Sequence, residues 1–288
     1  MIADKETNHL YLSDRLESDY PNFFKNFKKE LDRHSIAPKY LPDSRDVWCV
    51  DFMPIQINES DFVQFKYYPT YLRTKKLEKT ISDTSLICKQ IDLSPAVTEI
   101  IADGGNVTRS NNKVIMTTRV ITENPQYSTK ELTDKLTDLF QIDQLILIPE
   151  QPKDLTGHSD GMVRFIDNDT VIINDYSKEP VKDFQLHLKI ALHNAGLDTI
   201  EIPSSVYDND KYYDATGDYI NYLQMDGIIF VPTFKRKEDD KVIRQVQDIF
   251  SGTTIVPVES NELSKDGGII NCVTWNIKNK NNVWQQSI

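Results

Sequence analysis

One unit, a helix followed by a strand and a hairpin, recurs along this chain and constrains its fold more than any single motif. Ser128 and Glu131 fit a capping box at the start of an amphipathic helix. The segment LILIP, residues 145–149, then has the pattern of a buried strand ended by proline. Residues 157–175, GHSDGMVRFIDNDTVIIND, supply two strand-like runs around an Asn/Asp turn. This order predicts a helix, a strand and a hairpin in succession.

Four further copies follow the same order, although the one that starts near residue 80 has a poor helix. Gly196 is the expected C-terminal cap of one later helix, and Asp226-Gly227 the expected turn of its hairpin. The predicted helices lie at 20–35, 181–196 and 237–252, their strands at 37–42, 198–203 and 253–258, and their hairpins at 46–68, 217–234 and from 267 onward.

Each unit alone would leave an apolar face exposed to water, so the five units must pack against one another. Five such units are expected to close as a ring. The predicted fold class is therefore α/β, a five-bladed α/β propeller with pseudo-fivefold symmetry, formed as a single domain over residues 1–288.

Composition excludes several classes of protein. The formal net charge of −11 argues against a nucleic-acid surface, which would show clustered Lys and Arg. The three cysteines have unrelated spacings, which favours free thiols in a reducing compartment over a disulfide framework. The start is polar, and no run approaches the ~20 apolar residues of a membrane helix. We therefore expect a cytoplasmic protein with no membrane partner.

The turn that enters each predicted hairpin carries a polar or reactive residue, and a ring would bring these turns to its centre. Each has an ordinary alternative explanation. Cys272 could be a small buried hydrophobe, Asn221 a structural hydrogen-bonding residue, and the turns DGGN and GHSDG plain loops. Burying the carboxylate of the apolar stretch WCVDFMP costs free energy unless the carboxylate is paired. The five residues are Asp51, Asp103, His158, Asn221 and Cys272.

A thiol, an imidazole and several carboxylates around one cavity suit a planar cation. A guanidinium offers five N–H donors in a fixed fork that paired carboxylates can accept. Its central carbon is a poor electrophile until a strong nucleophile attacks it, and a thiolate is such a nucleophile. The set therefore predicts chemistry on a small cationic guanidino compound, without a metal or another cofactor.

Five segments of this chain resemble motifs of the guanidino-group-modifying enzymes of the pentein fold, most closely the agmatine deiminase and bacterial peptidyl-arginine deiminase branch. The segments occur in the family's order and span residues 46–277. GHSDG and the final glycine–cysteine block are the most specific. The five are WCVDFMP, DGGN, GHSDG, GDYINYL and GGIINCVTW.

The resemblance implies a role for each matching residue. Cys272 would attack the guanidinium carbon, and His158 would protonate the departing ammonia and then activate water. Asp103 would orient His158. The residues implied to bind substrate are Asp51, Asp160, Trp48 and Asn221.

This sequence also departs from the family pattern. Val50 stands where the family commonly has arginine, Asn271 where a histidine is frequent, and Trp275 where agmatine deiminases usually have glutamine. Asp103 replaces a glutamate that is one methylene longer. Arg119 lies where agmatine enzymes tend to carry an acid, so it could meet a carboxylate on an arginine-like substrate or simply be a solvated surface residue.

The predicted activity is hydrolytic deimination, with agmatine to N-carbamoylputrescine plus ammonia as the first candidate. Deimination of peptidyl-arginine or free arginine is the alternative. Amidino transfer and a non-catalytic pentein that only binds a partner are further alternatives. The acidic stretch at residues 207–219 could be a flap over the site, and the sequence leaves a homo-oligomer open.

Overall fold

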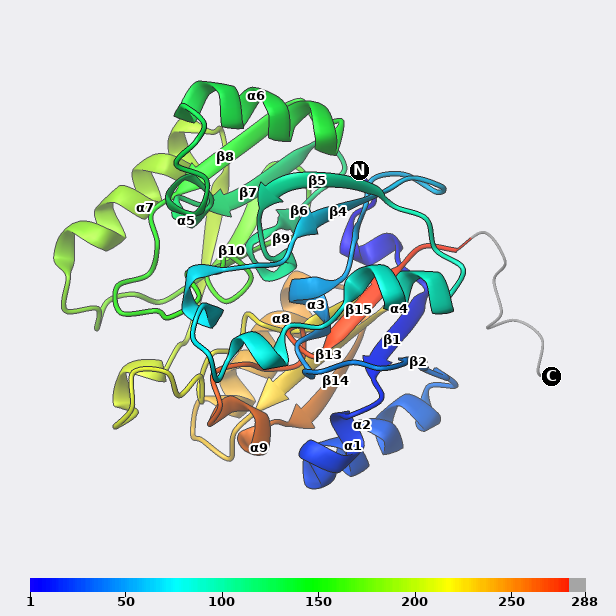
Figure 1. Ribbon diagram of the computed structural model, residues 1–288. Coiled ribbons are helices and arrows are strands. Elements are labelled where there is room, and N and C mark those ends of the chain that lie inside the picture. Colours follow the sequence, from blue (N-terminus) through cyan, green and yellow to red (C-terminus); the bar gives the residue numbers. More distant parts are fainter. Residues whose placement is uncertain (280–288) are drawn as a thin grey trace.

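The computed structural model describes residues 1–279 and forms five separate three-stranded sheets (Figure 1). In every sheet the first two strands are antiparallel and the second and third are parallel. The sheets are β15 (Thr274–Ile277), β1 (His9–Ser13) and β2 (Lys39–Leu41); β3 (Ile55–Gln56), β4 (Phe62–Lys66) and β5 (Ala96–Ile101); β6 (Thr108–Arg109), β7 (Lys113–Thr117) and β8 (Gln144–Ile148); β9 (Val163–Phe165), β10 (Thr170–Asn174) and β11 (Asp198–Ile202); and β12 (Leu223–Met225), β13 (Ile228–Thr233) and β14 (Thr254–Glu259).

One helix crosses from the second to the third strand of each sheet, as a parallel pair requires. These helices are α2 (Pro21–Arg33), α4 (Thr84–Gln90), α6 (Thr129–Phe140), α7 (Lys182–Asn194) and α8 (Asp239–Ile249). Short helices connect successive sheets: α3 (Cys49–Phe52), η4 (Gly104–Asn106), η5 (Val206–Asp208) and α9 (Asn261–Ser264). Further short helices lie before β1 or between the second and third strands of a sheet: η1 (Asp4–Glu6), α1 (Leu16–Asp19), η2 (Thr70–Leu72), η3 (Glu78–Thr80) and α5 (Arg119–Glu123). The result is five ββαβ blades, which confirms the predicted α/β propeller.

Local sequence signals account for several of these boundaries. The Ser128–Glu131 capping box starts α6, with both reciprocal hydrogen bonds present. Gly196 adopts a φ of +73° just after α7, and Gly227 a φ of +71° in the β12–β13 turn. The poor helix of the second copy is α4, a short one in which the Asp83 side chain accepts a hydrogen bond from the Leu86 N–H.

The two ends of the chain complete one sheet together. Strand β15 pairs antiparallel with β1, so that Tyr11 lies opposite Trp275. The last predicted hairpin therefore takes its second strand from the N-terminal region, which closes the ring. Trp275 is buried, donates from Nε1 to the Pro54 carbonyl at 2.8 Å and packs against the Tyr11 ring. It is a core residue. Cys49 and Cys88 lie in the same apolar cluster.

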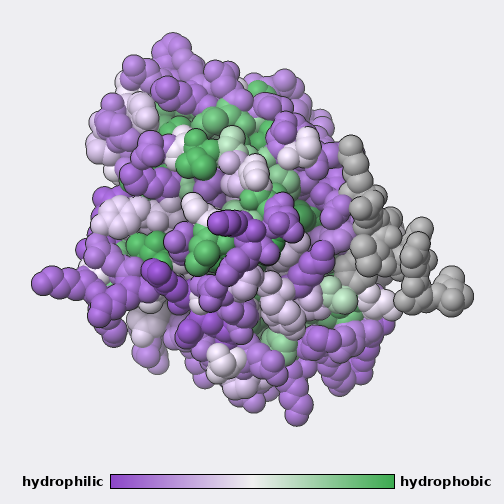
Figure 2. Space-filling view, turned by 45° about the vertical axis from the view of Figure 1, so that its right-hand side comes forward, coloured by the Kyte–Doolittle hydropathy of each residue, from purple (hydrophilic) through white to green (hydrophobic). Residues whose placement is uncertain are grey.

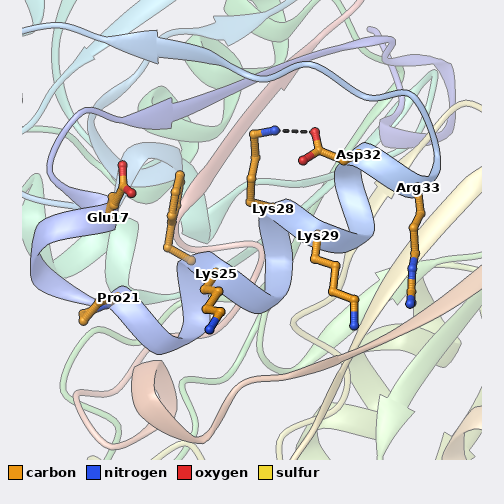
Figure 3. Close-up of a pocket in the computed structure, with 8 residues that line it drawn as sticks. Glu17, Pro21, Lys25, Lys28, Lys29, Asp32 and Arg33 are labelled. Atoms are coloured by element: carbon orange, nitrogen blue, oxygen red, sulfur yellow. Dashed lines mark hydrogen bonds and ion pairs between the residues drawn. The ribbon is translucent and has the colours of Figure 1, made fainter.

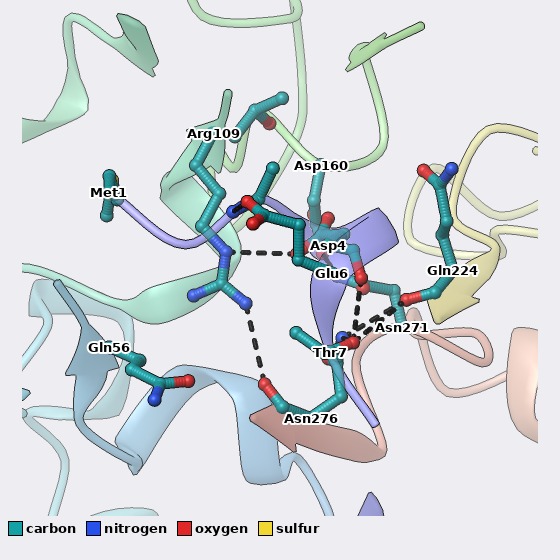
Figure 4. Close-up of polar contacts among 12 residues, drawn as sticks. Met1, Asp4, Glu6, Thr7, Gln56, Arg109, Asp160, Gln224, Asn271 and Asn276 are labelled. Atoms are coloured by element: carbon teal, nitrogen blue, oxygen red, sulfur yellow. Dashed lines mark hydrogen bonds and ion pairs between the residues drawn. The ribbon is translucent and has the colours of Figure 1, made fainter. Parts of the chain in front are cut away.

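A polar cluster lies around the N-terminal segment. The first strand of each sheet contributes one polar residue to this cluster. Asp4 accepts hydrogen bonds from Arg109 Nε at 3.0 Å and from Arg164 Nη2 at 2.8 Å. Asn276 donates to the Thr7 hydroxyl at 2.8 Å (Figure 4). We call residues 1–8 the N-terminal plug. The five first-strand residues are Gln56, Arg109, Arg164, Gln224 and Asn276.

The surface is mostly hydrophilic. Hydrophilic side chains cover most of the face in Figure 2, and apolar residues show between them in small groups. Within residues 1–279, no helix is both long and apolar enough to cross a membrane.

Candidate active site

Turns from the five sheets meet at one place, as the repeat predicts. Asp51 lies on α3, and Asp103 immediately precedes η4. His158 lies in the turn between β8 and β9, while Asn221 and Cys272 precede β12 and β15. All five side chains are buried, with Cys272 the most accessible at 9%. These residues are up to 221 positions apart in sequence and contact one another through the chain of bonds described below.

The His158 imidazole lies between two carboxylates. Its Nε2 is 2.9 Å from Asp103 Oδ2, a hydrogen bond, and its Nδ1 is 3.5 Å from Asp51 Oδ1. The shorter Asp103 therefore still reaches the histidine despite lacking the methylene of glutamate. Because the Nδ1 contact is long for a hydrogen bond, this nitrogen is the one available to exchange a proton with another group.

Glycine is required where the backbone passes between these side chains. Gly105 N–H donates to Asp51 Oδ1 at 3.1 Å, and the Gly105 carbonyl accepts from the Asp160 N–H at 3.1 Å. A Cβ on Gly105 would lie 2.6 Å from both Asp51 Oδ1 and His158 Nδ1. A Cβ on Gly104 would overlap the Val50 carbonyl oxygen. The DGG sequence thus brings a bare backbone against the acids and the imidazole.

Two glycines precede Cys272, and each position requires glycine for a different reason. Gly267 has a φ of +92°, which L side chains rarely adopt, and a Cβ there would lie 3.1 Å from the Tyr213 carbonyl of the 207–219 segment. Gly268 has no room for a Cβ because the Trp48 ring packs on it. Trp48 therefore supports the turn that carries the thiol.

Asn221 and Asp160 are the polar neighbours of the thiol. The Asn221 Oδ1 is 3.3 Å from Cys272 Sγ and accepts a hydrogen bond from the Cys272 N–H, also at 3.3 Å. Asp160 Oδ2 lies 4.0 Å from the sulfur and accepts from Asn271 Nδ2 at 2.7 Å. Asn271, noted in the sequence only as a departure from a pattern, is thus a direct partner of an acid that contacts the thiol.

The charges of this site are unbalanced. Burial, with Asp103 and Asp160 nearby, raises the pKa of Asp51 to about 8, although His158 opposes the shift. Burial also raises the pKa of Asp160. Burial lowers the pKa of His158, but Asp51 and Asp103 outweigh it and raise that pKa to about 10. Burial, Asp160 and Asp51 raise the pKa of the Cys272 thiol well above its usual range. Three carboxyl groups share one imidazolium, so the site favours a cation.

Arg119 is not a solvated surface residue. Its guanidinium forms an ion pair with Glu150 at 3.0 Å and its side chain is 23% exposed. The Arg119 Nε is buried, and a Cβ on Gly157 would lie only 2.8 Å from it. Arg119 therefore packs beside the histidine turn with its charge already compensated by a carboxylate.

Tyr71 contacts the site and has no signal in the sequence. Its hydroxyl donates to Asp103 Oδ2 at 2.9 Å, and its ring centroid is 6.3 Å from that of His158 in an edge geometry. Tyr71 comes from η2, in the segment between β4 and α4, which is not part of the repeated motif. No rule of spacing would have selected it from the tyrosines of this chain.

Other parts of the molecule do not add to this site. In residues 1–279, no group of three or more His, Cys, Asp or Glu side chains is arranged to hold a metal ion. A surface hollow of about 810 Å³ lies along α2 (Figure 3). Lysine and arginine side chains line it, and Lys28 pairs there with Asp32. None of the candidate site residues lines this hollow.

Comparisons with known proteins identify the family and the fold of this chain. A profile of the family described as Porphyromonas-type peptidyl-arginine deiminase matches residues 2–277. A Streptococcus mutans protein with a provisional agmatine deiminase name is 21% identical over 207 residues, which is 61% of this chain. That match spans 56% of the relative's own length.

Solved structures share the fold at low identity. The agmatine deiminase of C. jejuni superposes with a TM-score of 0.78 at 18% identity, covering 96% of this chain and 95% of that one. The agmatine deiminase of Enterococcus faecalis gives a TM-score of 0.75 at 16% identity, covering 97% and 95%. The five ββαβ sheets and these superpositions define a protein of the pentein fold. Because the family profile covers nearly the whole chain, the chain belongs to the Porphyromonas-type peptidyl-arginine deiminase family.

Proposed function

We propose that this protein is a hydrolytic deiminase of a guanidino compound, with agmatine as its substrate and N-carbamoylputrescine and ammonia as its products. The observation that carries the proposal is the assembly of a thiol, an imidazole and three carboxyl groups with too little positive charge. A guanidinium brings the missing charge and the N–H donors that carboxylates accept. Family membership supports the same reaction class.

The substrate's own charge supplies part of the activation. In the free protein, the raised pKa keeps Cys272 as a thiol, mainly because the sulfur is buried and further because Asp160 and Asp51 lie near it. A guanidinium held by Asp51 and Asp160 counters the effect of these acids on the thiol. The thiol then ionises more readily, its proton leaves to solvent, and the thiolate attacks the central guanidinium carbon.

His158 transfers the protons of the two half-reactions. Its pKa of about 10 makes it an imidazolium at neutral pH, with Nε2 fixed by Asp103 and Nδ1 available. Nδ1 donates a proton to the departing ammonia as the C–N bond breaks and a thiouronium forms on Cys272. The neutral Nδ1 then accepts a proton from water, which attacks the same carbon. As the C–S bond breaks, the remaining hydroxyl proton of the adduct passes to the sulfur, which releases the ureido product and restores the thiol.

Agmatine is favoured over free arginine by the state of Arg119. A substrate carboxylate would have to displace Glu150 from its 3.0 Å pair with Arg119, whereas an amine tail makes no such demand. Arginine and peptidyl-arginine remain the alternative substrates. Turnover of agmatine, arginine and peptidyl-arginine by wild type and Arg119→Ala tests this point. If Arg119 binds a substrate carboxylate, the variant must lose preference for a carboxylate-bearing substrate.

The decisive experiment is ammonia release from agmatine, free arginine and a peptidyl-arginine, with mass spectrometry of the trapped adduct on Cys272. Hydrolysis gives one ammonia per ureido product. Amidino transfer would instead need an added amine acceptor and would form a new guanidine. A folded wild-type protein that releases no ammonia from any guanidine would overturn the proposal in favour of a binding role.

A further inference from the structure

The segment between β4 and α4 delivers a phenol to the candidate site from outside the five repeated turns. This segment, residues 67–82, includes η2 and η3. Tyr71 on η2 donates its hydroxyl to Asp103 Oδ2 at 2.9 Å. The same oxygen lies 2.9 Å from His158 Nε2. One carboxylate oxygen therefore receives both the phenol and the imidazole, while the buried Asp103 Oδ1 has no hydrogen-bond partner among the described residues.

The segment is anchored, so the position of the phenol is defined by more than its own bond. The Thr70 N–H donates to Glu123 Oε1 at 2.9 Å, and Arg73 pairs with Glu123 Oε2 at 2.8 Å. The Glu123 side chain is only 4% exposed. The Arg73 guanidinium also lies 5.0 Å from the centroid of the Tyr68 ring. A buried acid on α5 thus holds the residues on both sides of Tyr71.

From this geometry we propose that Tyr71 is a positioning residue for the deiminase, which holds the Asp103 carboxylate in line with His158 Nε2 and shares its negative charge. The proposal rests on the proposed function. An aspartate reaches His158 with one methylene fewer than a glutamate, and a second bond to the same oxygen restricts its rotation. Because the phenol takes part of the carboxylate's charge, His158 gives up its proton more easily than it would beside an unshared Asp103.

The groups that face His158 define what a change at Tyr71 can do. Asp51 faces Nδ1, Asp103 faces Nε2, and Asp160 contributes from the same turn as His158. Removing the phenol hydroxyl leaves these three acids in place and strengthens the attraction of Asp103 for the imidazolium. The pKa of His158 is therefore expected to rise above its already raised value.

Tyr71→Phe is the direct test, because it keeps the ring against His158 and removes one hydroxyl. NMR titration of the labelled His158 ring between pH 6 and 11, assigned with His158→Gln, is expected to show a higher pKa in the variant. The kcat is expected to fall about tenfold, the equivalent of one hydrogen bond of about 1.4 kcal/mol, with KM within twofold. The alkaline limb of the pH–rate profile is expected to move to higher pH.

Tyr68→Phe is the matched control. It removes a hydroxyl from the same segment, where Tyr68 donates to Glu78 at 2.7 Å away from the site. This variant must leave both the titration and kcat unchanged. Glu123→Gln, which weakens the anchor but keeps the phenol, is expected to lower kcat less than Tyr71→Phe and to shift the pKa of His158 in the same direction.

An unchanged His158 titration in Tyr71→Phe, or an equal loss of activity in Tyr68→Phe, would overturn the positioning role. The titration needs no substrate. A wild type that deiminates nothing would therefore disprove the proposed function while the link between Tyr71, Asp103 and His158 could still be measured.

Discussion

The molecule has two polar clusters, one around the N-terminal plug and one at the candidate active site. They contain similar residues but differ in how their charges are balanced. In the plug, Asp4 receives two guanidinium groups and Thr7 receives the Asn276 amide. In the site, Asp51 and Asp103 contact the His158 imidazole, and Asp160 is influenced by the charge of His158 and more weakly by that of Arg164. The plug closes its hydrogen bonds within the chain, whereas the site holds charge that the chain does not balance. The first arrangement serves stability, and the second is suited to a ligand.

The largest expected effect separates chemistry from stability at the thiol. Cys272→Ala should reduce deiminase turnover more than ~10³-fold, because the proposed covalent intermediate forms on its sulfur. Its melting temperature should stay near that of wild type, since the thiol has no strong structural partner.

Cys88→Ala is the control. Cys88 is core, so this variant should lose about 1 kcal/mol of unfolding free energy and keep its turnover. Equal losses of turnover in both variants would contradict the assignment.

The converse effect is expected at the plug. Asp4→Ala leaves Arg109 and Arg164 facing each other, with side-chain exposures of 10% and 4%, and should cost about 3 kcal/mol of unfolding free energy. Chemical denaturation measures this loss. Asp134→Ala, which breaks an exposed pair with Lys130, should cost less than ~0.5 kcal/mol. If the two variants were equally stable, the plug would not be the stabilising cluster.

A smaller and opposite change in stability is expected inside the site. Asp51→Asn should lower turnover about 100-fold and raise the unfolding free energy by about 0.5–1 kcal/mol, because it removes a carboxylate that folding disfavours. With a pKa of about 8, Asp51 is mostly neutral at pH 5 and mostly ionised at pH 9. The gain in stability should therefore be larger at pH 9 than at pH 5. A variant less stable than wild type at both values would contradict this account.

A further expected effect is the pH dependence of wild-type stability. His158 has a folded pKa of about 10, above its unfolded value, so its contribution is fully present below pH 6.5 and is lost as pH rises through 10. Asp51 also has a raised pKa, so its contribution is lost as pH rises from about 4 through 8. Unfolding free energy measured by denaturant should fall from pH 6 to 10, and His158→Gln should flatten that fall. A rise over this range would contradict both signs.

The repeat, its turns and the convergence of the hairpin-entry residues could be predicted from the sequence, because their signals are local. The Ser128 capping box, Gly196 and the Asp226-Gly227 turn depend on residues a few positions apart, and the structure shows each of them. Five similar units already implied that Asp51, Asp103, His158, Asn221 and Cys272 would converge.

Other features depended on contacts that no local pattern encodes. Trp275 occupies the core because β15 pairs with β1 from the opposite end of the chain. Arg119 is paired because Glu150 happens to lie beside it, and Tyr71 reaches Asp103 from a segment without any repeat signal. Propensity and periodicity determine which elements form, since each depends on neighbouring residues. Only the packed ring determines which buried charges find partners, since that depends on residues brought together across the whole chain.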